Sequence, residues 1–164
     1  MDKTVKQIKL SKALQILDFI IAVFVIAFFG GLILVKYNHD GLLAEDFNTL
    51  LDTSLVVASG VSIVVCMVIL FLFLGVCHEI GKDNSFSIEN ASGLHKMAVC
   101  GGLYSMIYVV REIFQFISGI HGAYTLGFNV IMIFIGIIFL GICECLSRLV
   151  KNAYEIKLEN ELTI

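Results

Sequence analysis

The run from Leu55 to Cys77 contains no charged residue and no proline, which sharply limits the choice of fold. A helix needs about 20 mostly apolar residues to cross a bilayer. Three further runs have similar character: residues 13–35, 97–118 and 127–150. The chain is 59% hydrophobic and 15% charged, whereas soluble domains are about 45–50% apolar and about 25% charged. The sequence therefore predicts an all-α, integral membrane four-helix bundle, built as a single membrane domain from residues 1–164.

A cleaved signal peptide is the alternative for the first run, because a basic segment precedes it. The core of a signal peptide is roughly 7–15 residues long and ends at a small-x-small cleavage site. The apolar stretch here is longer, and no such site precedes a soluble chain. We therefore expect residues 13–35 to form a retained span.

Basic residues are distributed unevenly over the predicted ends and loops. Cytoplasmic loops of membrane proteins carry an excess of Lys and Arg. Of the 11 Lys and Arg residues, only Lys36 and Arg111 fall toward the side opposite the termini. We therefore expect both termini, the loop 78–96 and the tail 151–164 to be cytoplasmic, in a multi-pass protein of the plasma membrane.

The cytoplasmic loop contains the sequence GKDNSFSIEN, which has the features of a helix start. Ser87 is placed to accept a hydrogen bond from the amide of Asn90, as N-cap residues do. Glu89 falls in the first turn, where the helix dipole favours negative charge. Apolar residues then recur at helical spacing, so we predict a short amphipathic helix before the third span. Two interpretations stay open: a well-capped connector, and a docking surface for a cytoplasmic partner.

Two motifs resemble a bacterial family known as domain of unknown function 2975, whose members are small four-span membrane proteins. The loop motif consists of Gly81, Lys82, Phe86, Ser87, Glu89 and Asn90, and the tail motif of Glu159, Leu162, Thr163 and Ile164. Members of this family are often encoded beside a Cro/repressor-like helix-turn-helix regulator. The resemblance thus implies a regulatory membrane protein that binds or modulates such a transcription regulator. The predicted docking residues are Lys82, Phe86, Ser87, Glu89, Asn90, Glu159, Leu162 and Ile164.

Charged residues inside or beside the spans form the second group of candidates. A charge at membrane depth costs about 2.5–3.5 kcal/mol on insertion scales, so it usually faces the bundle interior with a partner. We expect Arg111 to pair with Asp52, Glu112 to find Lys36, and the two inner carboxylates to meet Lys12, His95 or Lys96. Structural pairing and a ligand or ion cavity both stay open. The set is Asp18, Asp52, Arg111, Glu112 and Glu144.

The sequence offers no motif for catalysis or cofactor binding. It lacks a phosphate loop, a nucleophile elbow and a dinucleotide fingerprint. The five cysteines are spaced as small packing residues rather than metal ligands or a disulfide framework. Glycines within the spans are expected to allow close helix packing. They are the pairs Gly30–Gly31 and Gly101–Gly102 and the single residues Gly60, Gly75, Gly136 and Gly141.

Two classes of function therefore remain. The first is a non-enzymatic regulatory membrane protein without cofactor, metal or direct nucleic-acid contact. Its partners are the lipid bilayer and a cytoplasmic regulator, and self-association is left open. The alternative is a small transport or peptide-immunity protein with a polar cavity around Arg111.

Overall fold

The computed structural model describes residues 2–38, 52–82, 85–119 and 122–162, and within these ranges it confirms the all-α prediction. The helices are α1 (Asp2–Asn38), α3 (Thr53–Gly81), α4 (Ile88–Ile117) and α5 (Ala123–Leu162). Three of the four predicted spans lie inside one of these helices, and the third in sequence, 97–118, extends one residue past the end of α4. All four helices are long and apolar enough to cross a membrane, which fits a multi-pass membrane protein.

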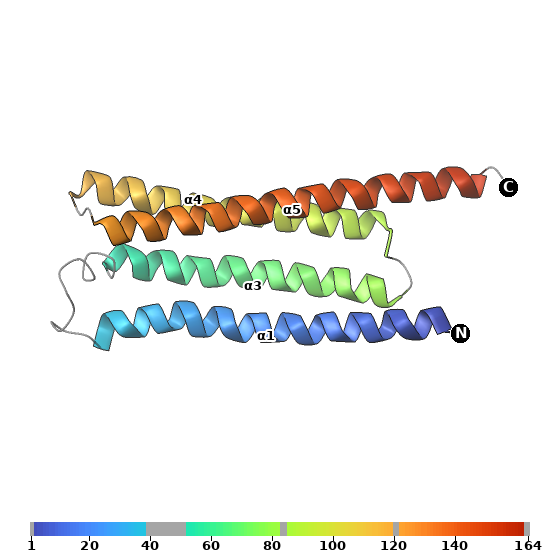
Figure 1. The fold of residues 1–164 in the computed structure, drawn as a ribbon, viewed down its shortest axis with the longest axis horizontal. Coiled ribbons are helices and arrows are strands. Elements are labelled where there is room, and N and C mark those ends of the chain that lie inside the picture. The colour runs from blue at the N-terminus through green and yellow to red at the C-terminus, as the bar shows by residue number, and fades with distance from the viewer. Residues whose placement is uncertain (1, 39–51, 83–84, 120–121, 163–164) are drawn as a thin grey trace.

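The helices run along one common axis, and each is antiparallel to the next (Figure 1). The start of α1, the end of α3, the start of α4 and the end of α5 lie at one end of the molecule, here called the inner end. The opposite end, here called the outer end, carries Asp52 and Ser118. The sequence-based expectation that both termini share one side agrees with this arrangement. Placement of the inner end in the cytoplasm stays a prediction from the basic residues.

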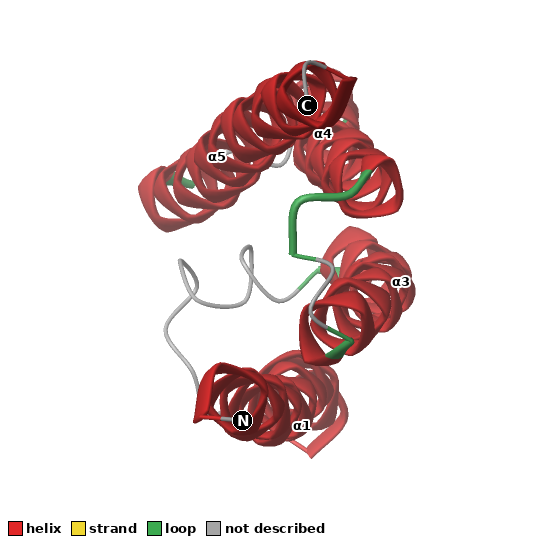
Figure 2. Ribbon diagram, turned by 90° about the vertical axis from the view of Figure 1, so that its right-hand side faces the viewer, coloured by secondary structure: helices red, strands yellow, loops and turns green. Residues whose placement is uncertain are grey.

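Viewed end-on, the four helices form an open arc rather than a closed bundle (Figure 2). Among the described helices, extensive packing joins α1 to α3, α3 to α4, and α4 to α5. The first and last helices of the arc therefore do not close onto each other. Many large apolar side chains point outward, including Phe71 and Ile117, as expected of a surface that faces lipid.

The start of α4 confirms the predicted cap. The amide of Asn90 donates to Oγ of Ser87 at 3.2 Å, and the backbone of Ser87 is extended, with φ −130° and ψ 157°. The predicted short amphipathic helix, however, is not a separate element. It forms the first turns of α4, which continues without a break to Ile117, because no proline interrupts the helical pattern.

Close packing between α4 and α5 depends on two glycines. A Cβ atom on Gly136 would lie 2.8 Å from the carbonyl oxygen of Gly101, and one on Gly101 would lie 2.8 Å from Phe139. The prediction of a packing role is therefore confirmed for this pair. It is wrong for glycines that face open space, because no side chain or backbone lies within 4 Å of their Cβ positions: Gly30, Gly31, Gly60, Gly75 and Gly141.

Candidate functional site

The predicted partnership of Arg111 with Asp52 is confirmed at the outer end. Asp52 is the N-cap of α3 and accepts from the amide of Leu55 at 3.0 Å and from Oγ of Ser54 at 2.6 Å. Nη2 of Arg111 donates to Oδ1 of Asp52 at 3.1 Å, and Nε donates to Oγ of Ser54 at 3.1 Å. Arg111 is only 3% exposed. The guanidinium thus ties α4 to the first turn of α3.

Asn129 of α5 extends this contact into a network across three helices. Its amide oxygen accepts from Nη1 of Arg111. Its amide nitrogen donates to Oε2 of Glu112 at 2.5 Å and to Oε1 of Gln115 at 3.0 Å. Asn129 is fully buried. We call this set the outer polar network: Asp52, Ser54, Arg111, Glu112, Gln115 and Asn129.

The environment of Asp52 favours its ionised form. Burial raises the pKa of this carboxyl, but the hydrogen bonds from Ser54, Arg111 and Leu55, together with the charge of Arg111, outweigh burial and lower it below the ordinary value of 3.8. The contact with Arg111 is therefore an ion pair at neutral pH.

A buried aromatic layer supports the network on its inner side. Tyr108 lies one turn before Arg111 on α4 and is fully buried. Its hydroxyl accepts from Oγ of Ser62 at 3.2 Å. Its ring packs against Tyr104 and Phe128 at centroid distances of 5.3 and 6.1 Å. This layer separates the outer polar network from the apolar interior.

The network joins α3, α4 and α5 through hydrogen bonds between side chains. Its carboxylates and amides are engaged with one another and with the guanidinium. Two polar atoms nearby, Nε2 of Gln115 and Oγ1 of Thr125, are buried without a hydrogen-bond partner among the described residues. One cavity bounded by described residues lies farther inward and is not lined by Arg111.

The other charged candidates meet mixed outcomes. Glu144 reaches His95 at 2.7 Å, as expected, and also Arg148 at 3.0 Å. No ion pair joins Glu112 to Lys36 among the described residues; Oε2 of Glu112 instead accepts from Asn129. Asp18 meets none of its predicted partners: it is buried, and its Oδ1 has no hydrogen-bond partner in the described part of the chain. The open arc explains this difference, since α1 packs extensively only on α3.

The predicted docking residues divide into buried and exposed groups. Ser87 and Asn90 are buried, and they fix the start of α4, where the side chain of Asn90 also donates to the carbonyl of Ser85 at 3.0 Å. They are therefore not available as surface. The exposed residues of the loop and tail are Lys82, Phe86, Glu89 and Glu159. Leu162 ends α5, and Ile164 lies outside the described residues.

Sequence reasoning missed the neutral members of the outer polar network. Gln115 and Asn129 carry no charge, so a search for charges inside spans passed over them. A signal was present, however: Tyr104, Tyr108, Arg111 and Gln115 recur at helical spacing on one face of the least apolar span. Residues 125 and 129 repeat the pattern on α5. A polar stripe at this spacing on each of two neighbouring helices predicts that the two stripes face each other.

Comparisons with known proteins identify a family but no characterised relative. A family model described as "Protein of unknown function (DUF2975)" matches residues 36–164. The match includes α3, α4, α5 and the whole outer polar network, and it leaves out nearly all of α1. No curated protein matches the chain, and no solved structure matches it.

Proposed function

The chain belongs to the DUF2975 family, and we propose that it is a non-enzymatic regulatory protein of a bacterial plasma membrane. Its inner end binds a cytoplasmic partner, with a helix-turn-helix transcription regulator as the leading candidate. The docking surface includes the exposed loop residues Lys82, Phe86 and Glu89 and the end of α5.

The observation that carries this proposal is the length of α5. The helix has 40 residues, which corresponds to about 60 Å at 1.5 Å per residue, whereas the hydrocarbon core of a bilayer is about 30 Å thick. Its last turns extend past the inner ends of the other helices (Figure 1). They expose Ile156 and Leu158 between charged side chains. Apolar side chains on a protruding, charged helix are suited to bind another protein.

The link between the two ends supports a regulatory role. The inner end of α4 is capped by Ser87, and its outer part carries Arg111 and Gln115. The fully buried Asn129 lies on α5, whose other end is the protruding tail. Because Gly101 and Gly136 bring these helices into close contact, a change at the outer polar network is expected to move them as a pair.

Capture of a helix-turn-helix regulator tests the proposal. The full-length protein, with an affinity tag at its N-terminus, is co-expressed with each such regulator encoded near its gene and purified in detergent. We expect the parent chain to retain a regulator. Deletion of Glu159–Ile164 should abolish retention while membrane insertion and helix content stay normal, because the deletion removes no part of a span.

Two surface variants localise the contact. The double substitution of Ile156→Ser with Leu158→Ser should weaken capture without shortening α5. Lys151→Ala, an exposed residue of the same helix nearer the membrane, serves as the matched control and should leave capture unchanged. Equal retention by the parent, the deletion variant and the Ile156→Ser/Leu158→Ser variant would exclude the tail as docking surface. Failure of the parent to retain any regulator would refute the proposed partner.

A further inference from the structure

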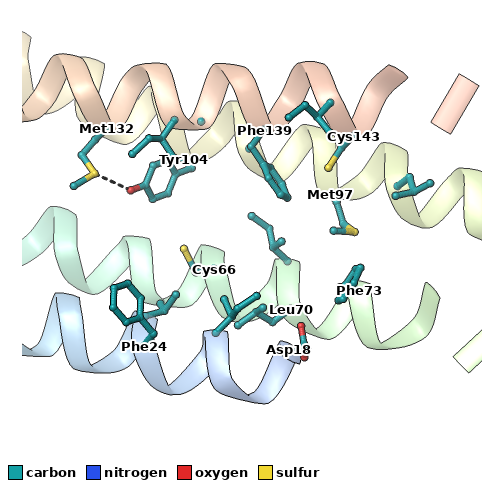
Figure 3. Close-up of a pocket in the computed structure, with 18 of the residues that line it drawn as sticks. Asp18, Phe24, Cys66, Leu70, Phe73, Met97, Tyr104, Met132, Phe139 and Cys143 are labelled. Carbon is teal, nitrogen blue, oxygen red and sulfur yellow. Dashed lines mark hydrogen bonds between the residues drawn. The ribbon is translucent and has the colours of Figure 1, made fainter. Parts of the chain in front are cut away.

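A large cavity lies between the two halves of the arc. Its volume is about 610 Å³ and residues of all four helices line it. Phe24 of α1, Leu70 of α3, Met97 of α4 and Phe139 of α5 surround it (Figure 3). Extensive packing does not join α1 to α5 among the described helices, so the arc is open between them (Figure 2). We call the cavity the lateral groove.

Asp18 is the one charged residue among the described residues that line the lateral groove. It lies toward the inner end, while Tyr104 and Met132 lie toward the outer end (Figure 3). Asp18 is 3% exposed, and its Oδ1 is buried without a hydrogen-bond partner. None of the ion pairs among the described residues includes it. An unpaired carboxylate in an otherwise apolar setting is costly, so a site of this kind points to a missing positive partner.

We propose that the lateral groove binds a lipophilic cation that enters from the membrane. The positive centre lies against the carboxylate of Asp18, and the apolar body extends along the aromatic and aliphatic side chains toward Phe24. The cavity falls within the range of about 300–1,000 Å³ that is usual for small-molecule sites. An acyl chain of a lipid would fill the apolar part but would leave the carboxylate unpaired.

This site is separate from the regulatory role proposed above. Asp18 precedes residue 36, where the family match begins, and it is far from the tail along the chain. The site therefore depends on residues of α1 that the family match does not include. Failure of either proposal leaves the other intact.

Charge-matched probes test the groove. The full-length protein is placed in nanodiscs of zwitterionic phosphatidylcholine, and binding of tetraphenylphosphonium is measured by equilibrium dialysis. Tetraphenylborate has the same shape with the opposite charge and is the comparison probe. We expect saturable binding of tetraphenylphosphonium only, with one molecule bound per chain.

Two carboxylate variants assign the binding to Asp18. Asp18→Asn keeps the shape of the side chain and should weaken binding by about 10- to 100-fold, since it removes the electrostatic attraction between the carboxylate and the cation in an apolar setting. Glu144→Gln removes a carboxylate that does not line the groove and should leave binding unchanged. Melting of both variants in detergent shows that they are folded.

The absence of tryptophan from the chain allows a direct reporter. Phe24→Trp places a single indole in the groove, and its emission should change with tetraphenylphosphonium at the same midpoint as dialysis. Phe116→Trp, at an outer-end residue that is 73% exposed, should not respond.

Three results would each overturn the proposal. Equal binding of both probes, or no effect of Asp18→Asn, would make the groove a space for acyl chains. Lack of saturable binding by the folded protein would exclude the cation. The third result concerns the Phe24→Trp variant without any probe. If its emission varied with the number of chains per nanodisc, a second copy of the chain would occupy the groove.

Discussion

Replacement of Arg111 by leucine should destabilise the protein strongly, because it removes the centre of the outer polar network. The guanidinium donates to Asp52, Ser54 and Asn129. Hydrogen bonds inside membrane proteins contribute on average about 0.6 kcal/mol and at most about 1.7 kcal/mol each. Loss of three such bonds corresponds to about 2–5 kcal/mol. The upper part of this range overlaps the roughly 3–5 kcal/mol lost when a buried ion pair is broken on one side.

Unfolding in mixed detergent micelles, followed by circular dichroism, measures this loss. Asp52→Asn in the Arg111→Leu background should restore part of the stability, because it removes the unpaired carboxylate. Arg148→Leu is the matched control: this arginine is 77% exposed and pairs with Glu144 four residues away. Its loss should cost less than about 0.5 kcal/mol. Equal stability of Arg111→Leu and the parent would refute the view that the network holds the helices together.

Three further predictions concern other parts of the molecule. Because the pKa of Asp52 is lowered below 3.8 in the folded protein, its contribution to stability should be complete above that pH and be lost as the pH falls below it; Asp52→Asn should flatten this part of an acid-unfolding curve. Gly136→Ala should lower the melting temperature, since its Cβ would clash with α4, whereas Gly60→Ala should not; equal effects would contradict the close approach. In a variant without native cysteines, an impermeant thiol reagent added to intact cells should label Asp40→Cys but not Asn84→Cys; labelling of the latter would reverse the topology.

Much of the fold and some of the site could be predicted from single residues and their spacing. Long apolar runs with few charges located the helices, and Ser87 marked a helix start because a capping hydroxyl acts within a few residues. Asp52 and Arg111 could be paired because both lie at the outer ends of neighbouring spans. These predictions require only the local sequence or the depth at which each residue lies in the membrane.

The remaining features depend on which helices touch, and a single sequence does not show this. Asp18 was expected to meet His95 or Lys96, as it would in a closed bundle, but the open arc separates α1 from α4. Gly101 has a packing role and Gly60 has none, and this difference also depends on which helices touch. The inner limit of α5 also escaped prediction, because charged residues such as Lys157 end an apolar run without ending a helix.

The uninterrupted course of α5 makes it a lever. Asn129 lies in the outer polar network, and Lys157 lies 28 positions farther along the same helix, a distance of about 42 Å. If α5 turns as a rigid rod about its outer end, a tilt of about 5° moves Lys157 sideways by about 4 Å. A shift at the network too small to break a hydrogen bond would therefore reach the far end of the helix as a displacement larger than the length of such a bond.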